Sequence, residues 1–380
     1  MDILIVMLHS KLQQFAMLPR VLRGLLLSPL AVLMTGCGAV VLQPAGDVAL
    51  QQRNLILVST VLMLLIIVPV MVLTAVFAWR YRRSNTKADY QPDWNHSTSL
   101  ELVIWSAPLL IIIALGAVTW IATHTLDPYR PVARLSATQP LAAGAKPLKV
   151  QVVALDWKWL FVYPDYGIAT VNEMAAPVDV PIEFQITASS VMNSFFIPAL
   201  AGQIYAMPAM ETQLHAVINK PGDYEGFSAN YSGAGFSDMH FRFLGMSQAD
   251  FGRWVQTVKS GGGTLGREDY LALAQPSERE PVRRYAEVAP GLYDAILNLC
   301  VNPDKMCLRD MMKVDAKGGL GMANVYNVGR LAYDKPAGDD DGQAPKPGLA
   351  YVLALCAADP GRLWSPAPGN VATPRPTMNR

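Results

Sequence analysis

The sequence predicts a protein in two parts, a membrane hairpin of two transmembrane α-helices followed by an all-β sandwich, with short C-terminal helices and a flexible tail. Hydrophobic residues make up 52% of the 380 residues and charged residues only 16%, a balance typical of membrane proteins. Two long uncharged runs come early in the chain, and short β-type runs separated by turn residues follow them. The formal net charge of +1 gives no reason to expect nucleic acid as a partner.

Residues 1–36 have the pattern of a signal peptide. Two arginines precede the uncharged run 25–33, which is too short to span a bilayer but fits the apolar region of a signal sequence. Small residues then lead directly into Cys37. This junction resembles the cleavage site of bacterial lipoproteins, which implies that Cys37 is acylated and anchors the mature chain in lipid. Translation from Met17 and an uncleaved hydrophobic helix remain open as alternatives.

Two uncharged stretches predict transmembrane helices. Residues 55–79 and residues 102–122 are each long enough to cross the hydrocarbon core. The connecting segment 80–101 is rich in positive charge, and the positive-inside bias therefore places it in the cytoplasm. Residues 37–54 then lie outside the membrane, in agreement with a secreted N-terminus, and so does the chain after residue 122. The four cationic residues of the loop are Arg80, Arg82, Arg83 and Lys87.

A β-rich domain is predicted over residues 148–246, after a Pro/Ala-rich linker at 123–147. Short β-type runs separated by turn signals such as Pro221-Gly222-Asp223 predict an antiparallel sandwich or barrel. The five clearest runs are residues 148–154, 159–163, 182–187, 212–218 and 239–244.

The C-terminal part is predicted to be helical over 247–301 and flexible over 302–380. Ser247 to Asp250 has a capping-box pattern that opens a helix. Composition indicates a flexible tail beyond residue 302, apart from one apolar run at 349–355. In an oxidising compartment Cys300 and Cys307 could pair across a short loop, which leaves Cys356 over. Whether they pair stays open at this point.

Two stretches carry a family resemblance. Residues 190–198 resemble a turn of the cupredoxin fold, and residues 229–242 resemble the loop that surrounds the dinuclear copper centre of cytochrome oxidase subunit II, which reads Cys-x3-Cys-x3-His-x2-Met. A copper pair of this kind needs bridging thiolates, but no cysteine lies between Cys37 and Cys300. The resemblance therefore implies a cupredoxin-like domain without copper. The positions that correspond to the ligands are Asn193, Tyr231, Gly235, Met239 and Arg242. A different copper site built from His240 and nearby methionines is the alternative.

Further stretches make the resemblance more specific. Residues 156–159, 163–173 and 203–207 are similar to subunit II of cytochrome bo-type ubiquinol oxidases, members of the haem-copper oxidase superfamily. Such complexes oxidise ubiquinol, reduce oxygen to water and pump protons in the bacterial inner membrane. The resemblance implies that the haems and the copper lie in subunit I, that subunits III and IV are further partners, and that this chain binds no cofactor. A copper-binding cytochrome c oxidase subunit II and a free-standing membrane lipoprotein are the competing hypotheses.

Glu101 is the candidate site residue at the cytoplasmic start of the second span. The resemblance implies that it lies at the mouth of a proton channel used by subunit I, where it takes part in proton uptake. A carboxylate in the first turn of a helix is also favoured by the helix dipole alone. Trp157 and Trp159 are expected to share one strand face and to serve as an interface anchor rather than an electron relay.

Overall fold

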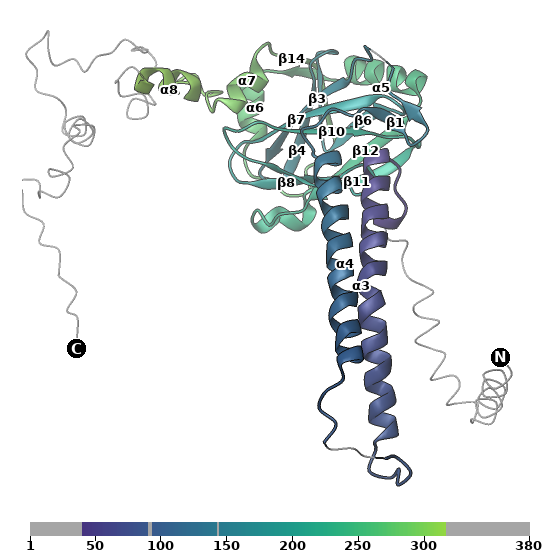
Figure 1. Cartoon of the computed structure of the whole chain (residues 1–380). Helices are drawn as coiled ribbons and strands as arrows, with labels where there is room; N and C mark the ends of the chain where they lie inside the picture. The colour runs from purple at the N-terminus through teal and green to yellow at the C-terminus, as the bar shows by residue number, and fades with distance from the viewer. Residues whose placement is uncertain (1–39, 90–92, 143, 317–380) are drawn as a thin grey trace, which may run out of the picture.

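A computed structural model of the chain describes residues 40–89, 93–142 and 144–316. Two helices, α3 (Asp47–Arg80) and α4 (Thr98–Thr125), run side by side below a β-rich domain (Figure 1). Both are long and apolar enough to cross a membrane, and their apolar side chains are exposed. The short helix η1 (Val40–Leu42) precedes them.

Helix α3 begins eight residues before the span expected at 55–79, because the polar residues that follow Asp47 continue the same helix. Its 34 residues correspond to about 50 Å, against a hydrocarbon core of about 30 Å. The additional length carries the start of α3 into the β-domain. There the Ala45 and Gly46 N–H groups donate to the Ala199 carbonyl oxygen at 2.9 and 3.0 Å.

The segment expected as a linker, residues 123–147, is partly structured. It contains a small hairpin of β1 (Arg134–Ser136) and β2 (Gln139–Pro140) beside the start of α3. The Asn219 side chain donates to the Leu135 carbonyl oxygen at 2.8 Å and so ties this hairpin to the β-domain. This hydrogen bond joins residues 84 positions apart in the sequence, and composition gives no sign of it.

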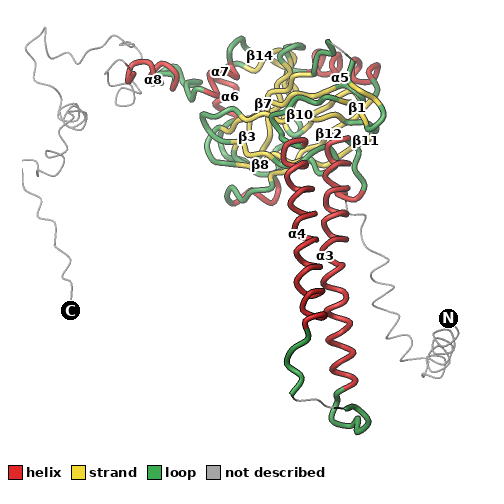
Figure 2. The backbone as a smooth tube through the Cα atoms, viewed as in Figure 1, coloured by secondary structure: helices red, strands yellow, loops and turns green. Residues whose placement is uncertain are grey.

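The β-domain is a two-sheet sandwich, as predicted (Figure 2). The seven-stranded sheet has the order β10-β7-β3-β4-β5-β14-β13, and the five-stranded sheet has the order β6-β12-β11-β8-β9. Aromatic rings fill the space between the sheets, with Trp159 edge-on to Phe195 and Phe241 at centroid distances of 5.4 and 5.7 Å. The strands are β3 (Leu148–Leu155), β4 (Lys158–Tyr163), β5 (Ile168–Val171), β6 (Glu173–Pro177), β7 (Pro181–Ala188), β8 (Asn193–Phe196), β9 (Ile204–Ala206), β10 (Thr212–Val217), β11 (Gly222–Ser228), β12 (His240–Met246), β13 (Gly263–Leu265) and β14 (Arg283–Val288), with the short helix η2 (Ala234–Asp238) before β12.

The region expected to be helical at 247–301 also contains two strands. Helix α5 (Gln248–Gly261) begins at the predicted cap, where the Asp250 N–H donates to Ser247 Oγ at 3.1 Å. After it, β13 and β14 extend the seven-stranded sheet, with β14 antiparallel to β5. The expectation of helices alone was wrong because β5 leaves unpaired backbone groups at its edge, which a later segment can satisfy. Helices α6 (Arg267–Leu273) and α7 (Leu292–Leu297) complete the region.

Structure continues into the segment expected as a flexible tail. Cys300 and Cys307 form a disulfide, and α8 (Leu308–Ala316) follows it. The expectation of flexibility was therefore wrong for residues 302–316, where a covalent link and a helix hold the chain. The signal peptide, Cys37, the apolar run 349–355 and Cys356 lie outside the described residues.

Candidate functional site

Residues 229–242, which resemble a copper-binding loop, fold against the β-domain, but their side chains do not form a set of metal ligands. Asn193 and Met239 are buried, and Asn193 Oδ1 accepts a hydrogen bond from the Ser228 hydroxyl at 3.1 Å. Tyr231 is 76% exposed. Arg242 pairs with Asp223 on the outer face of the sheet at 2.5 Å. Of the five predicted positions, only Asn193, Gly235 and Met239 are buried within this loop region.

Trp157 packs directly beneath the loop. Its indole N–H donates to the Ser232 carbonyl oxygen at 3.2 Å. A Cβ atom added to Gly235 would lie 2.6 Å from the indole ring, and one added to Gly233 would lie 3.0 Å from it. Gly233 also has φ of +120°, which side chains rarely tolerate. Two glycines therefore let the loop close tightly over Trp157.

The residues present do not fit a dinuclear copper centre. Such a centre needs thiolate bridges, and the buried side chains of the loop offer only an amide and a thioether. Both ring nitrogens of His240, the residue of the alternative copper site, lie near protein oxygens, with Nε2 3.0 Å from the Ser237 carbonyl oxygen and Nδ1 2.8 Å from Glu225 Oε1. In the described ranges, no group of three or more His, Cys, Asp or Glu side chains could hold a metal.

Trp157 and Trp159 do not share a strand face, contrary to expectation. Trp157 lies in the turn between β3 and β4, with φ of 64°. Trp159 is fully buried between the sheets. The i and i+2 argument failed because the strand is interrupted at Asp156 and Trp157, where the alternation of side chains is broken.

Two buried charges near this region were missed by sequence reasoning. Glu173 Oε1 accepts hydrogen bonds from Arg284 at 2.7 Å and from the Trp254 indole at 3.2 Å, which joins β6, β14 and α5. Lys158 Nζ donates to the Gln275 carbonyl oxygen at 2.7 Å, and its burial lowers the pKa of Lys158 below the ordinary value. Their partners are 111 and 117 residues away in the sequence, so no local pattern could identify them.

Glu101 lies in the first turn of α4, at the end of the hairpin far from the β-domain (Figure 1). Its Oε1 lies 2.7 Å from His96 Nδ1, and His96 Nε2 lies 3.2 Å from the Thr98 hydroxyl. The side chains of Glu101 and His96 are 49% and 62% exposed. The carboxylate is thus accessible to water and lies next to an imidazole ring.

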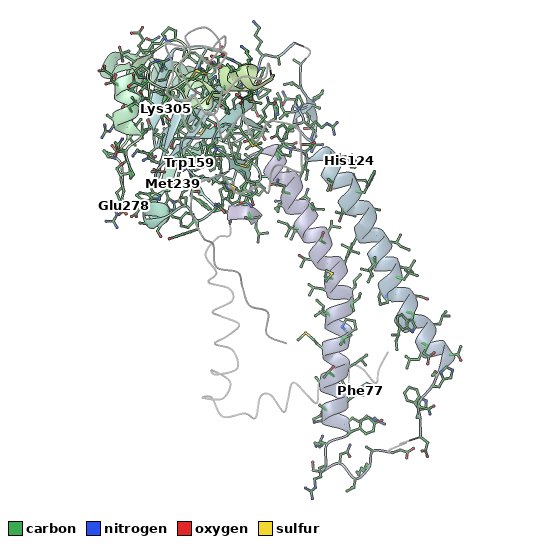
Figure 3. All side chains as sticks on the ribbon, turned by 90° about the vertical axis from the view of Figure 1, so that its left-hand side faces the viewer. Phe77, His124, Trp159, Met239, Glu278 and Lys305 are labelled. Atoms are coloured by element: carbon green, nitrogen blue, oxygen red, sulfur yellow. A yellow bond between two sulfur atoms is a disulfide. The ribbon has the colours of Figure 1, made fainter. Side chains whose placement is uncertain are left out.

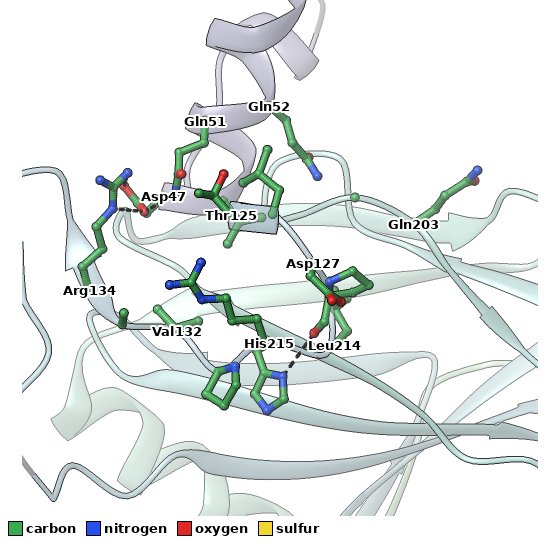
Figure 4. A pocket seen from close by; sticks show the side chains of 17 residues that line it. Asp47, Gln51, Gln52, Thr125, Asp127, Val132, Arg134, Gln203, Leu214 and His215 are labelled. Atoms are coloured by element: carbon green, nitrogen blue, oxygen red, sulfur yellow. Dashed lines mark hydrogen bonds and ion pairs between the residues drawn. The ribbon is translucent and has the colours of Figure 1, made fainter. Parts of the chain in front are cut away.

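The opposite end of the hairpin is anchored to the β-domain around a small cavity of about 290 Å³ (Figure 4). Asp47, the first residue of α3, is almost completely buried and binds Arg134 through Nε at 2.8 Å and Nη2 at 3.2 Å. Gln51 donates to the same carboxylate at 2.7 Å. On the other side of the cavity, His215 Nδ1 donates to the Pro128 carbonyl oxygen at 3.1 Å.

Comparison with known proteins identifies the family. Residues 166–243 match the family described as cytochrome c oxidase subunit II, periplasmic domain, and residues 259–304 match the COX aromatic rich motif. The chain is 51% identical to cytochrome bo(3) ubiquinol oxidase subunit 2 of Pseudomonas putida over 267 residues, which are 70% of this chain and 82% of that protein. It is also 51% identical to ubiquinol oxidase subunit 2 of Acetobacter aceti, over 70% of this chain and 84% of that protein.

Among solved structures, the periplasmic domain of subunit II of cytochrome oxidase from Bradyrhizobium japonicum is 25% identical, with a TM-score of 0.29 over 32% of this chain and 96% of that one. The two ubiquinol oxidase subunits each match over 267 residues, 70% of this chain. The chain therefore belongs to the ubiquinol oxidase subunit 2 family of the haem-copper oxidases.

Proposed function

We propose that this chain is the copper-free subunit II of a proton-pumping terminal ubiquinol oxidase. In this proposal the haems and copper lie in subunit I, subunits III and IV complete the complex, and electrons from ubiquinol enter subunit I without passing through this chain. The observation that carries the proposal is the loop over Trp157, which has no thiolate and is closed by two glycines.

The solubility of ubiquinol in the membrane explains why this subunit would need no copper. A copper relay is needed where the electron donor is a water-soluble protein that docks outside the membrane. Ubiquinol dissolves in the lipid and can reach subunit I laterally, so an outer relay has no role. The β-domain can then lose its metal ligands and remain as a packed cap on the complex.

The test is electron-donor preference together with metal content. The purified complex should oxidise ubiquinol rapidly and soluble cytochrome c slowly. Metal analysis of this chain, separated from subunit I, should find no copper. Two copper ions per chain with thiolate-type absorption, or rapid oxidation of soluble cytochrome c, would contradict the proposal. Haem absorbance and quinol oxidase activity that never co-purify with the chain would instead favour a free-standing membrane lipoprotein.

The proposed topology is two-pass in the bacterial inner membrane. The loop between α3 and α4 is cytoplasmic, the β-domain is periplasmic, and Cys37 carries the lipid anchor. Support comes from the arginines after α3 and from the apolar helices. Protease added to spheroplasts should digest the β-domain and leave the hairpin loop intact. Radioactive palmitate should label the wild-type chain but not the Cys37→Ser variant.

We further propose that Glu101 is a proton-entry residue for subunit I. An exposed carboxylate paired with His96 at the cytoplasmic end of the hairpin suits transfer of protons from bulk water. Glu101→Ala should slow ubiquinol turnover and proton pumping while the subunits remain associated. The matched control is Glu225→Ala, which removes a second exposed carboxylate that is paired with a histidine, at 2.8 Å from His240.

A purely structural role of Glu101 would give a different result. If the carboxylate serves only the helix dipole, Glu101→Ala lowers thermal stability by about 0.3–1 kcal/mol and leaves turnover and pumping unchanged. Equal turnover in the Glu101→Ala and Glu225→Ala complexes would therefore rule out proton entry at Glu101.

A further inference from the structure

The loop that follows α3 has a hollow lined by basic side chains. Neither the copper-free β-domain nor proton entry at Glu101 gives this hollow a role. The hollow has a volume of about 770 Å³. We call it the arginine hollow, and its lining includes Arg80, Arg82, Arg83, Asp89, Phe77, Tyr81 and Trp94. Figure 3 shows the side chains of this loop gathered at the tip of the hairpin, next to Phe77. From this hollow we infer a binding site for the phosphodiester headgroup of an anionic phospholipid.

The position of the hollow suits a lipid headgroup. Residues 54–79 contain no charged side chain, and Arg80 is the last residue of α3. The arginines therefore lie where the helix leaves the hydrocarbon core, at the level of lipid phosphates. Phe77 is 52% exposed one turn earlier, so an acyl chain attached to a headgroup in the hollow can lie along the apolar surface of α3.

The charges of the hollow are available to an anion. Three arginines and one carboxylate, that of Asp89, line the hollow, so cationic side chains outnumber anionic ones there. Arg82 donates to the Trp79 carbonyl oxygen at 2.9 Å and to the Ser84 hydroxyl at 3.1 Å, and it stacks 4.9 Å from the Trp79 ring. These contacts orient the Arg82 guanidinium group without neutralising it. Guanidinium groups bind phosphate oxygens in a forked geometry.

The aromatic lining distinguishes a lipid from a free phosphate ion. Tyr81 and Trp94 are exposed, and the Arg80 guanidinium lies 5.9 Å from the Tyr81 ring. Amphipathic rings of this kind are enriched at the headgroup level of membranes. A soluble phosphate ion would need only the arginines, whereas a phospholipid also covers Phe77 and the rings. The inference rests on the cytoplasmic placement of this loop in the proposed topology.

The experiment compares lipid binding by full-length chains reconstituted with vesicles of phosphatidylethanolamine, with and without phosphatidylglycerol. The test variant is Arg82→Gln/Arg83→Gln. The matched control is Lys149→Gln/Lys259→Gln, which removes the same charge from exposed positions of the β-domain. Loss of two cationic contacts near the surface should weaken phosphatidylglycerol retention about thirty-fold, measured by native mass spectrometry. The control should retain the lipid like the wild type.

Further measurements distinguish a failure of the lipid inference from a failure of the proposed function. Protease protection confirms that the variants keep their orientation, and the Arg82→Lys/Arg83→Lys variant preserves the loop charge if the glutamine pair misinserts. Ubiquinol turnover in the same preparations reports on the proposed function independently. Equal retention by test and control variants, equal retention of phosphatidylethanolamine, or displacement of the lipid by inorganic phosphate would overturn the inference. If the glutamine variant loses subunit I but keeps the lipid, the arginines bind the partner subunit and not a lipid, which would also overturn the inference.

Discussion

The joint between α3 and the β-domain permits a quantitative prediction. The Asp47 side chain is 2% exposed, whereas that of Arg134 is 40% exposed. Removing one partner of a buried ion pair costs about 3–5 kcal/mol. In Arg134→Gln the buried carboxylate keeps the hydrogen bond from Gln51 and keeps up to about 1 kcal/mol of stabilisation from the start of the helix, so the penalty is at the lower end of this range. We therefore expect Arg134→Gln to lower the free energy of unfolding by about 2–4 kcal/mol.

The reciprocal variant should cost less. Asp47→Asn leaves a guanidinium group that water can solvate, so we expect a loss of about 1 kcal/mol. The double variant should be more stable than Arg134→Gln alone, because no buried charge is left without its partner. Urea unfolding of the purified chain in detergent, followed by tryptophan fluorescence, measures all three values. The control is Arg279→Gln, which removes an exposed pair with Asp238 and should change stability by less than about 0.5 kcal/mol.

The decisive result is the difference in stability loss between Arg134→Gln and Asp47→Asn. If Arg134→Gln costs no more than Asp47→Asn, burial of the carboxylate does not control the energetics of the joint. If the double variant loses the sum of the two single losses, the two side chains act independently. Either result would refute the conclusion that this ion pair anchors the hairpin to the β-domain.

Three further predictions concern the β-domain. Gly235→Ala should displace Trp157 and destabilise the domain by about 1–3 kcal/mol, seen as an altered tryptophan emission spectrum; an unchanged spectrum and stability would contradict the close approach. Burial raises the pKa of Tyr163, so the unfolded state loses its proton first as pH rises, and stability should fall above about pH 10, by about 1.4 kcal/mol from this group at pH 11. Tyr163→Phe should reduce that fall, and an equally steep profile would refute the assignment. Cys300→Ser should cost about 2.5 kcal/mol of loop-closure entropy and speed hydrogen exchange after Cys307, whereas unchanged exchange would show that the link adds no constraint.

The long-range contacts explain where prediction from sequence failed. Residues 148–246 were predicted to be a β-domain, and the first and last strands of that stretch start and end at these positions. The strands β13 and β14 were not predicted, because their short runs become strands only by pairing with an edge that forms elsewhere in the chain. The absence of cysteines from residues 229–242 is readable from the sequence, whereas the closure of the loop over Trp157 depends on a turn in another sheet.

The sequence by itself determined the two apolar helices, the β-sandwich, the helix cap at Ser247 and the absence of thiolates from residues 229–242, because hydropathy, alternation, capping and residue identity are local properties of the chain. Only the tertiary structure decided the joint at Asp47 and Arg134, the buried network of Glu173 and Arg284, and the pairing of Glu101 with a neighbouring imidazole. Each of these depends on the directions in which side chains point after folding, and buried charges in particular acquire partners only when distant segments meet.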